Sequence, residues 1–219
     1  MEDRNKLIKN LIPKDVKTVL DIGSKGDIFK GNYQTKTLDV VEKADIKQDL
    51  NINQKLNFPD NSFDSVTAFG AFHWIVFFSE ERSISEIKRV LKLGGRFIVV
   101  NKKDVSNFSE DIKHVIKKYC EKELPTIHEN YKPEEILARN GFKDIKISAF
   151  PTEERFTENE YLSYVQTMSV WNIVSENKKK IALEELEEQF KKIKIGIGVV
   201  RKIEIRVISG ENNDRISNN

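Results

Sequence analysis

Two runs of residues decide the fold of this chain: Leu56-Asn-Phe-Pro-Asp-Asn-Ser-Phe-Asp-Ser-Val66 and Glu86-Ile-Lys-Arg-Val-Leu-Lys-Leu-Gly-Gly-Arg-Phe97. In the first run, Pro59-Asp-Asn has the chemistry of a turn, and a strand is expected to begin at Asp64. In the second run, apolar residues recur at helical spacing until a glycine pair, which ends a helix and starts a strand. Together the two runs predict a turn, a strand, a helix and a second strand.

The same alternation of strands and helices continues along the chain. Strands are expected at 17–22, 35–41, 44–50, 64–69, 95–100, 142–150 and 199–208, and helices at 79–92, 107–122, 133–140, 158–174 and 177–194. The helix at 158–174 has the clearest start, because Thr157-Glu-Asn-Glu160 is a capping box. This order is typical of a parallel sheet with helices on both faces. The last strand follows two helices and is expected to pair antiparallel to its neighbour.

Three features lie where predicted strands end, which is where open α/β sheets bind their ligands. Val19-Leu-Asp-Ile-Gly-Ser-Lys-Gly26 leads from a strand into a glycine turn, where backbone N–H groups can approach an anionic group. Asp39 ends the run Thr37-Leu-Asp39 in the second strand, and a carboxylate there can accept hydrogen bonds from ribose hydroxyls. Asp49-Leu50 ends the third strand. The alternative interpretation is an ordinary turn followed by exposed acids.

The two opening runs, with Ala71-Phe-His-Trp74, resemble the runs L-P-F-P-D-N-S-F-D-x-V, E-I-x-R-V-L-K-P-G-G-x-F and H-W of class I, S-adenosylmethionine-dependent methyltransferases. The resemblance is strong over residues 19–100. It continues weakly through residues 140–142 and 156–169, which look like the type 11, trans-aconitate methyltransferases. Two positions depart from the family: Lys25 stands where a middle glycine is usual, and Leu93 replaces a proline.

The resemblance implies a Rossmann-like α/β fold with a mostly parallel, seven-stranded sheet whose last strand is antiparallel. Residues 1–210 would form a single methyltransferase domain, and residues 158–194 would be a helical lid inserted before the last strand. Residues 211–219 (ENNDRISNN) are polar and are expected to be a flexible tail.

The resemblance also implies the site residues. S-adenosyl-L-methionine would be bound by Asp21, Gly23, Ser24, Gly26, Asp39, Asp49, Leu50 and Phe69. His73 follows the fourth strand and is the candidate general base, needed only if the acceptor must lose a proton. Trp74, Tyr161 and Tyr164 are candidates for substrate binding. The alternative is that His73 is structural, that Trp74 packs in the core and that the tyrosines are core or cap residues. No metal site is expected.

Composition limits the partners. The 219 residues carry 37 basic and 35 acidic side chains, a net charge of +2, so a nucleic-acid partner is not favoured. The single cysteine excludes an internal disulfide.

The polar start and the lack of a long apolar stretch favour a cytoplasmic protein without a membrane partner. A small-molecule acceptor is expected, methylated on oxygen or on a carboxyl group. Oligomeric state stays open.

Two other classes of protein are consistent with parts of this pattern. An NAD-dependent oxidoreductase would show G-x-G-x-x-G opening a full helix, which Gly23-Ser-Lys-Gly-Asp27 does not. The stronger alternative is a protein with the methyltransferase fold that has lost catalysis and acts as a binding or regulatory partner. The altered glycine loop favours that alternative, whereas Asp39 and Asp49 favour an enzyme.

Overall fold

The computed structural model describes residues 12–24, 29, 31, 33–39, 43–50, 55–79, 82–121 and 131–213. The chain separates into two compact units. Unit 1 consists of residues 1–101, 127–149 and 206–219, and unit 2 consists of residues 102–126 and 150–205.

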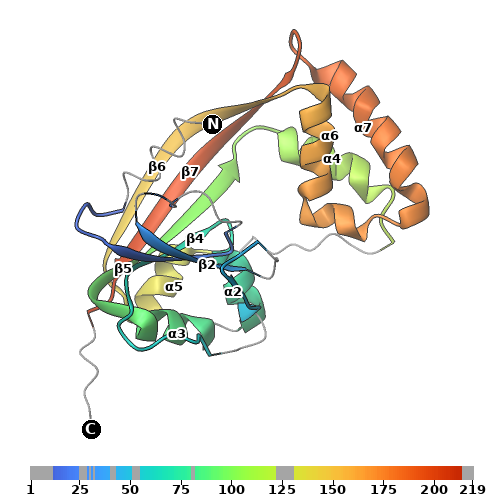
Figure 1. Ribbon diagram of the computed structural model, residues 1–219. Helices are drawn as coiled ribbons and strands as arrows, with labels where there is room; N and C mark the ends of the chain where they lie inside the picture. The colour runs from blue at the N-terminus through green and yellow to red at the C-terminus, as the bar shows by residue number, and fades with distance from the viewer. Residues whose placement is uncertain are drawn as a thin grey trace. The chain divides into compact units, whose positions relative to one another are not determined.

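Seven strands form a mixed sheet in the order β3-β2-β1-β4-β5-β7-β6 (Figure 1). The strands are β1 (Thr18–Ile22), β2 (Gln34–Asp39), β3 (Ile46–Lys47), β4 (Phe63–Phe69), β5 (Leu91–Asp104), β6 (Lys143–Phe156) and β7 (Val199–Glu211). β1 pairs parallel with β2 and β4, β3 pairs parallel with β2, and β5 pairs parallel with β4. β7 runs antiparallel to both β5 and β6. The predicted fold class, including the antiparallel last strand, is confirmed.

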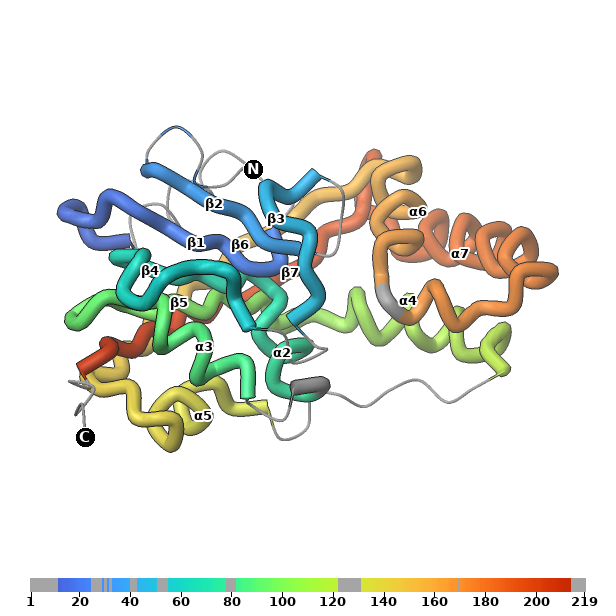
Figure 2. Tube along the Cα trace, turned by 60° about the horizontal axis from the view of Figure 1, so that its bottom comes forward, coloured from blue at the N-terminus to red at the C-terminus, as the bar shows by residue number. Residues whose placement is uncertain are grey.

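Three helices of unit 1 lie on one face of this sheet: α2 (Phe72–Ser79), α3 (Arg82–Val90) and α5 (Pro133–Arg139) (Figures 1 and 2). They bury an apolar cluster against the strands, which includes Phe72, Ile84, Val90 and Leu137. α3 is shorter than the predicted helix, because the chain joins β5 from Leu91 onward. α2 is a helix that the sequence did not predict.

The two runs that decide the fold are joined by Arg89. From α3, its guanidinium donates to the backbone oxygens of Leu56 and Phe58 at 2.8 Å and pairs with Asp60 at 2.7 Å. Glu86, one turn earlier, pairs with Arg89 and accepts from the backbone N–H of Leu56 at 2.9 Å. The two runs therefore occur together because one supplies the charged side chains that the backbone of the other requires.

Asp64 joins the starts of three parallel strands. Its carboxylate accepts from the backbone N–H groups of Lys17 and Thr18, from the Thr18 hydroxyl and from Lys92. Burial by itself would raise the pKa of Asp64, but these hydrogen bonds outweigh it and hold the pKa well below its usual value. The turn and strand predicted around Asp64 are therefore fastened to β1 and β5.

The end of the chain is more ordered than the sequence indicated. β7 continues through Glu211, and Asn212 is buried. The Asn212 side chain donates to the carbonyl oxygens of Lys88 and Leu91 at 3.1 Å, which satisfies backbone groups left free where α3 ends. Two residues of the predicted tail therefore belong to the fold, and residues 214–219 lie outside the described part of the chain.

Unit 2 has its own apolar core. It contains α4 (Phe108–Lys117), α6 (Glu158–Thr167), the 3-10 helices η2 (Ser169–Ile173) and η3 (Glu176–Lys178), and α7 (Lys179–Ile193). Tyr161, Trp171, Leu186 and Phe190 are among the buried residues. The predicted capping box is confirmed: the Thr157 hydroxyl accepts from the Glu160 N–H, and Glu160 accepts from the Thr157 N–H at 2.9 Å.

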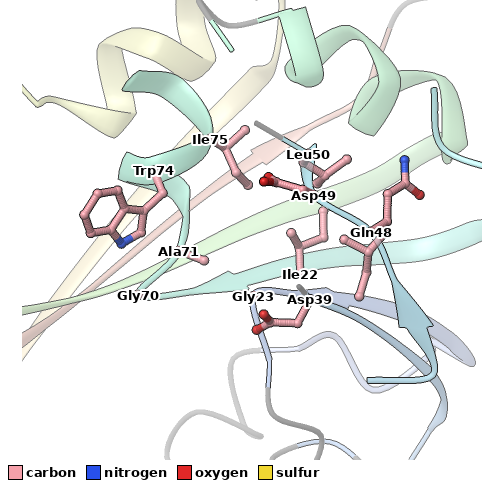
Figure 3. Close-up of a pocket in the computed structure, with 11 residues that line it drawn as sticks. Ile22, Gly23, Asp39, Gln48, Asp49, Leu50, Gly70, Ala71, Trp74 and Ile75 are labelled. Atoms are coloured by element: carbon pink, nitrogen blue, oxygen red, sulfur yellow. The ribbon is translucent and has the colours of Figure 1, made fainter. Parts of the chain in front are cut away.

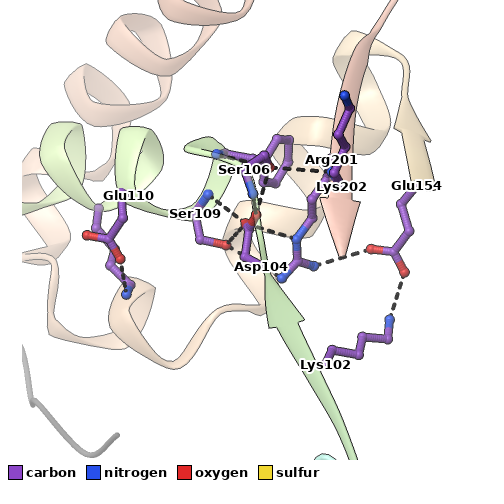
Figure 4. Close-up of polar contacts among 10 residues, drawn as sticks. Lys102, Asp104, Ser106, Ser109, Glu110, Glu154, Arg201 and Lys202 are labelled. Carbon is purple, nitrogen blue, oxygen red and sulfur yellow. Dashed lines mark hydrogen bonds and ion pairs between the residues drawn. The ribbon is translucent and has the colours of Figure 1, made fainter. Parts of the chain in front are cut away.

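A buried arginine network ties the strands of unit 2 to α4 (Figure 4). Arg201 of β7 is 7% exposed and pairs with Asp104 of β5 and Glu154 of β6 at 3.2 Å. Asp104 also accepts from the backbone N–H groups of Ser106 and Ser109 at 2.9 Å, at the start of α4. Two carboxylates therefore balance the buried guanidinium, which is the condition for burying a charge without a large penalty.

Within the described part of the chain, every helix is too short or too polar to cross a membrane. The same residues contain no cluster of three or more histidine, cysteine and acidic side chains arranged to hold a metal ion.

Candidate functional site

A cavity of about 320 Å³ opens in unit 1 where β1, β2 and β4 end (Figure 3). It lies at the carboxyl ends of parallel strands, and β1 has β2 on one side and β4 on the other, so the strand order reverses there. That position is where open α/β sheets bind ligands. The lining residues are Ile22, Gly23, Leu38, Asp39, Gln48, Asp49, Leu50, Gly70, Ala71, Trp74 and Ile75.

Gly23 sits at the centre of the strand ends and has to be glycine. Its φ is +71°, in the left-handed region, and its N–H donates to the Leu38 carbonyl at 2.7 Å. A Cβ added at Gly23 would lie 2.1 Å from the Cβ of Ala71. The turn after β1 and the turn after β4 therefore touch directly, and no side chain fits between them.

Asp39 and Asp49 both line this cavity (Figure 3). Asp39 is the last residue of β2, and its carbonyl accepts from the Gln48 N–H at 2.9 Å, which brings the segment after β3 alongside it. Leu50 is buried, and its carbonyl accepts from the Ser83 hydroxyl of α3 at 2.9 Å. The structure therefore brings together Gly23, Asp39, Asp49 and Leu50, four residues that the sequence singled out.

Asp21, at the end of β1, is 1% exposed. Burial raises its pKa to about 6, although hydrogen bonds with Ser24 and Thr67 act in the opposite direction. The Thr67 hydroxyl of β4 donates to Asp21 Oδ1 at 2.6 Å. Asp21 and Ser24 are thus buried partners of each other next to the Gly23 turn, rather than part of the cavity wall. A positive group placed near this turn would stabilise the ionised carboxylate.

Of the predicted residues that follow β4, Trp74 lines the cavity, and His73 packs against Trp74. The His73 ring is tilted against Trp74 with centroids 5.0 Å apart, and meets the ring of Tyr131 edge-on at 5.9 Å. Phe69 is the last residue of β4 and is half-buried, while the next two residues, Gly70 and Ala71, form the wall.

Tyr131, whose ring contacts His73, and its hydrogen-bond partner Asn101 are polar residues that the sequence did not single out. Asn101 Nδ2, at the end of unit 1's part of β5, donates to the Tyr131 hydroxyl at 3.4 Å. Burial raises the pKa of Tyr131 above its usual value. No motif marks either residue, because the contacts of Tyr131 with His73 and Asn101 join distant parts of the chain. Gln48 was missed as well, although it directly precedes Asp49.

The other predicted residues lie elsewhere. Tyr161 belongs to the core of unit 2, and the half-buried Tyr164 packs against that core and lines a shallow pocket on α6. Tyr161 is fully buried, and its hydroxyl is 3.1 Å from Gln189 Oε1, while the Tyr164 ring lies 5.2 Å from the guanidinium carbon of Arg201. Gly26 and the unusual Lys25 fall outside the described residues.

Comparison with known proteins agrees with this geometry. Residues 20–99 match a family model described as a methyltransferase domain. No curated protein matches the chain.

Several solved structures share the fold over nearly the whole chain. A provisionally assigned methyltransferase from Bacillus halodurans is 17% identical with a TM-score of 0.56, covering 98% of this chain and 100% of that one. A provisionally assigned type II methyltransferase from Anaeromyxobacter dehalogenans is 14% identical with a TM-score of 0.62, covering 97% and 96%. A SAM-dependent methyltransferase from Thermotoga maritima is 16% identical with a TM-score of 0.51, covering 95% and 87%. Residues 20–99 are therefore similar to a methyltransferase domain, and the sheet has the fold of these methyltransferase structures.

Proposed function

We propose that this protein transfers the methyl group of S-adenosylmethionine to a small-molecule acceptor, and that the cavity at the ends of β1, β2 and β4 binds the cofactor. The observation that carries the proposal is that Gly23, Asp39, Asp49 and Leu50 line one cavity. At about 320 Å³, that cavity falls within the size range of small-molecule sites.

The residues present suit an adenosyl group. Asp39 would accept hydrogen bonds from the two ribose hydroxyls, as acids do at the end of the second strand in nucleoside-binding α/β folds. Asp49 would accept from the adenine amino group, and the Leu50 N–H would face a ring nitrogen. The glycine turn after β1 would approach the amino-acid part of the cofactor with backbone N–H groups. The Gly23 N–H itself donates to the Leu38 carbonyl, so other N–H groups of the turn would have to make these bonds.

The bound cofactor would supply an activated methyl group on a sulfonium, and the protein would orient the acceptor and exclude water. His73 and Trp74 of α2 stand next to the turn that follows β4, where we place the acceptor. His73 would remove a proton from a hydroxyl acceptor, whereas a carboxylate acceptor needs no base. We favour an oxygen or carboxyl acceptor, and the trans-aconitate type stays a prediction.

The test of this proposal is calorimetric titration with S-adenosylhomocysteine. We expect the wild-type protein to bind it, and Asp39→Ala to weaken binding about 100-fold, because two hydrogen bonds to a charged group are lost. Asp60→Ala is the matched control: Asp60 is an acid of the same unit that pairs with Arg89 and is absent from the cavity lining.

Two results would count against the proposal. If the wild-type protein fails to bind S-adenosylhomocysteine, the catalytically inactive alternative gains support. If Asp39→Ala and Asp60→Ala bind equally well, the ligand lies elsewhere and the role given to this cavity is wrong.

A further inference from the structure

The turn between α7 and β7 exposes two large apolar side chains at its tip. Ile195 is 81% exposed and Ile197 is 91% exposed, whereas the other exposed large apolar residues of the described chain reach at most 57%. In Figure 1 this turn extends beyond the adjoining end of α7. We call residues 194–198 (Lys-Ile-Gly-Ile-Gly) the isoleucine tip.

The backbone of the isoleucine tip is held in one conformation. The Ile195 N–H donates to the Gly198 carbonyl at 2.8 Å, and the Gly198 N–H donates back at 3.4 Å. Gly196 has a φ of +65°, which glycine adopts without strain. A Cβ at Gly198 would lie 2.6 Å from the carbonyl oxygen of Phe156, so the base of the tip packs closely on the end of β6. The two isoleucines are therefore presented by a tight turn rather than by a frayed end.

Positive charge surrounds the tip in the sequence. Between Glu188 and Glu204 every charged residue is cationic: Lys191, Lys192, Lys194, Arg201 and Lys202. Arg201 is buried with its carboxylates, and Lys191 pairs with Glu188 at 2.8 Å while also interacting with Glu158 and Glu187. Lys192 and Lys194 are exposed and precede the isoleucines, and Lys192 also interacts with Glu185 and Glu188 of α7.

From this combination we propose that the isoleucine tip inserts into the surface of an anionic lipid bilayer, with Lys192 and Lys194 contacting the headgroups. A bilayer accepts a convex tip without a complementary pocket, and basic residues beside apolar ones are what anionic membrane surfaces bind. A stable protein interface would need about 1,000 Å² or more of buried surface, far more than two side chains supply. This proposal replaces the sequence-based expectation of no membrane partner, and it does not depend on the proposed methyltransferase function.

The experiment measures partition of the full chain onto vesicles of phosphatidylcholine, with and without phosphatidylserine. We expect binding to the anionic vesicles, weaker binding to neutral ones, and a decrease with added salt. The double variant Ile195→Ser/Ile197→Ser should lower the partition coefficient at least tenfold, because it removes the apolar area that would enter the bilayer. Lys192→Glu/Lys194→Glu should also weaken binding and remove most of its salt dependence.

Ile181→Ser is the matched control, since Ile181 is a 54% exposed isoleucine of α7 in the same unit. It should bind like the wild-type protein. Thermal unfolding of all variants should be unchanged, because the replaced side chains are exposed. In Ile197→Trp, the fluorescence added by the new indole should shift to shorter wavelength with anionic vesicles.

Three outcomes would overturn the proposal: no binding of the wild-type protein to anionic vesicles, equal binding of the double serine variant to them, or equally strong binding of the wild-type protein to neutral and anionic vesicles. Sedimentation equilibrium gives a fourth. If the wild-type protein is a dimer and the double serine variant a monomer, a second copy of the chain covers the tip instead of a membrane.

Discussion

Asp21 has a buried carboxyl group next to the proposed cofactor site. The ionisation of this group can be followed in the protein without ligand. Its pKa is raised from 3.8 to about 6 by burial. Below the unfolded-state value Asp21 is protonated in both states and costs nothing. As the pH rises from 3.8 to about 6, the folded protein loses stability relative to the unfolded chain, because Asp21 ionises more easily once it is exposed to water.

Asp21→Asn should remove this pH dependence. The amide oxygen can still accept from the Thr67 hydroxyl, so the hydrogen bond at 2.6 Å has a replacement acceptor. Between pH 3.8 and about 6, the free energy of unfolding of the wild-type protein should fall relative to that of the variant by about 3 kcal/mol. Urea unfolding at a series of pH values measures the difference. Parallel pH profiles for the two proteins would show that Asp21 titrates normally.

His73 gives a kinetic prediction at the same scale. His73 contacts Trp74 and Tyr131 and is absent from the cavity lining. His73→Ala should therefore leave the affinity for S-adenosylhomocysteine unchanged. If the acceptor loses a proton to His73, turnover should fall about 100-fold or more. The measurement is release of S-adenosylhomocysteine with a cell extract as the source of acceptor. Unchanged turnover would remove His73 from the mechanism.

The sequence predicted which residue types lie at the strand ends, but it did not predict which of their side chains face the cavity. Gly23, Asp39, Asp49, Leu50 and Trp74 all line the cavity. Phe69 was selected for its position at the end of β4, yet the chain turns at Gly70, whose φ is +65°, and presents Ala71 instead. A one-residue offset at a turn changes which side chain faces a ligand, and periodicity does not resolve such an offset.

At the scale of elements, local signals succeeded where a helix or strand contains its own start or stop. The capping box at Thr157 is such a signal, and α6 begins directly after it. α2 has no comparable pattern, because Phe72–Ser79 is apolar on all sides and lacks the alternation of an amphipathic helix. The predicted helix at 79–92 ends early because Leu91 pairs with Phe63 of β4. Pairing with a neighbouring strand decided that boundary.

The capping box allows a stability prediction for α6. Thr157→Ala removes the oxygen that accepts from the Glu160 N–H, and leaves that donor without its partner. The free energy of unfolding should fall by about 1 kcal/mol. Thr157→Ser keeps the hydroxyl and is the matched control, expected to behave like the wild-type protein. Equal losses in the two variants would point to the threonine methyl group rather than the cap.

At the scale of the whole molecule, the two compact units differ in what they contribute. All lining residues of the cavity belong to unit 1, whereas the predicted lid, residues 158–194, belongs to unit 2. Hydrogen exchange with and without S-adenosylhomocysteine should show protection at β1, β2 and the segment that contains Asp49. The lid role stays a prediction. The lid role requires the ligand to slow hydrogen exchange within residues 158–194. Equal exchange rates there with and without the ligand would contradict it.

The sequence by itself determined the order of the strands and of the α-helices other than α2, the antiparallel last strand and the acids at the strand ends, because turn chemistry, periodicity and caps act over a few neighbouring residues. The tertiary structure alone decided that Tyr131 contacts both His73 and Asn101, that Asp21 is buried with a raised pKa, and that Tyr161 lies in the core of unit 2. Those outcomes depend on contacts between residues far apart in the chain. Burial and hydrogen bonding at such contacts are properties of the packed molecule, which no local pattern contains.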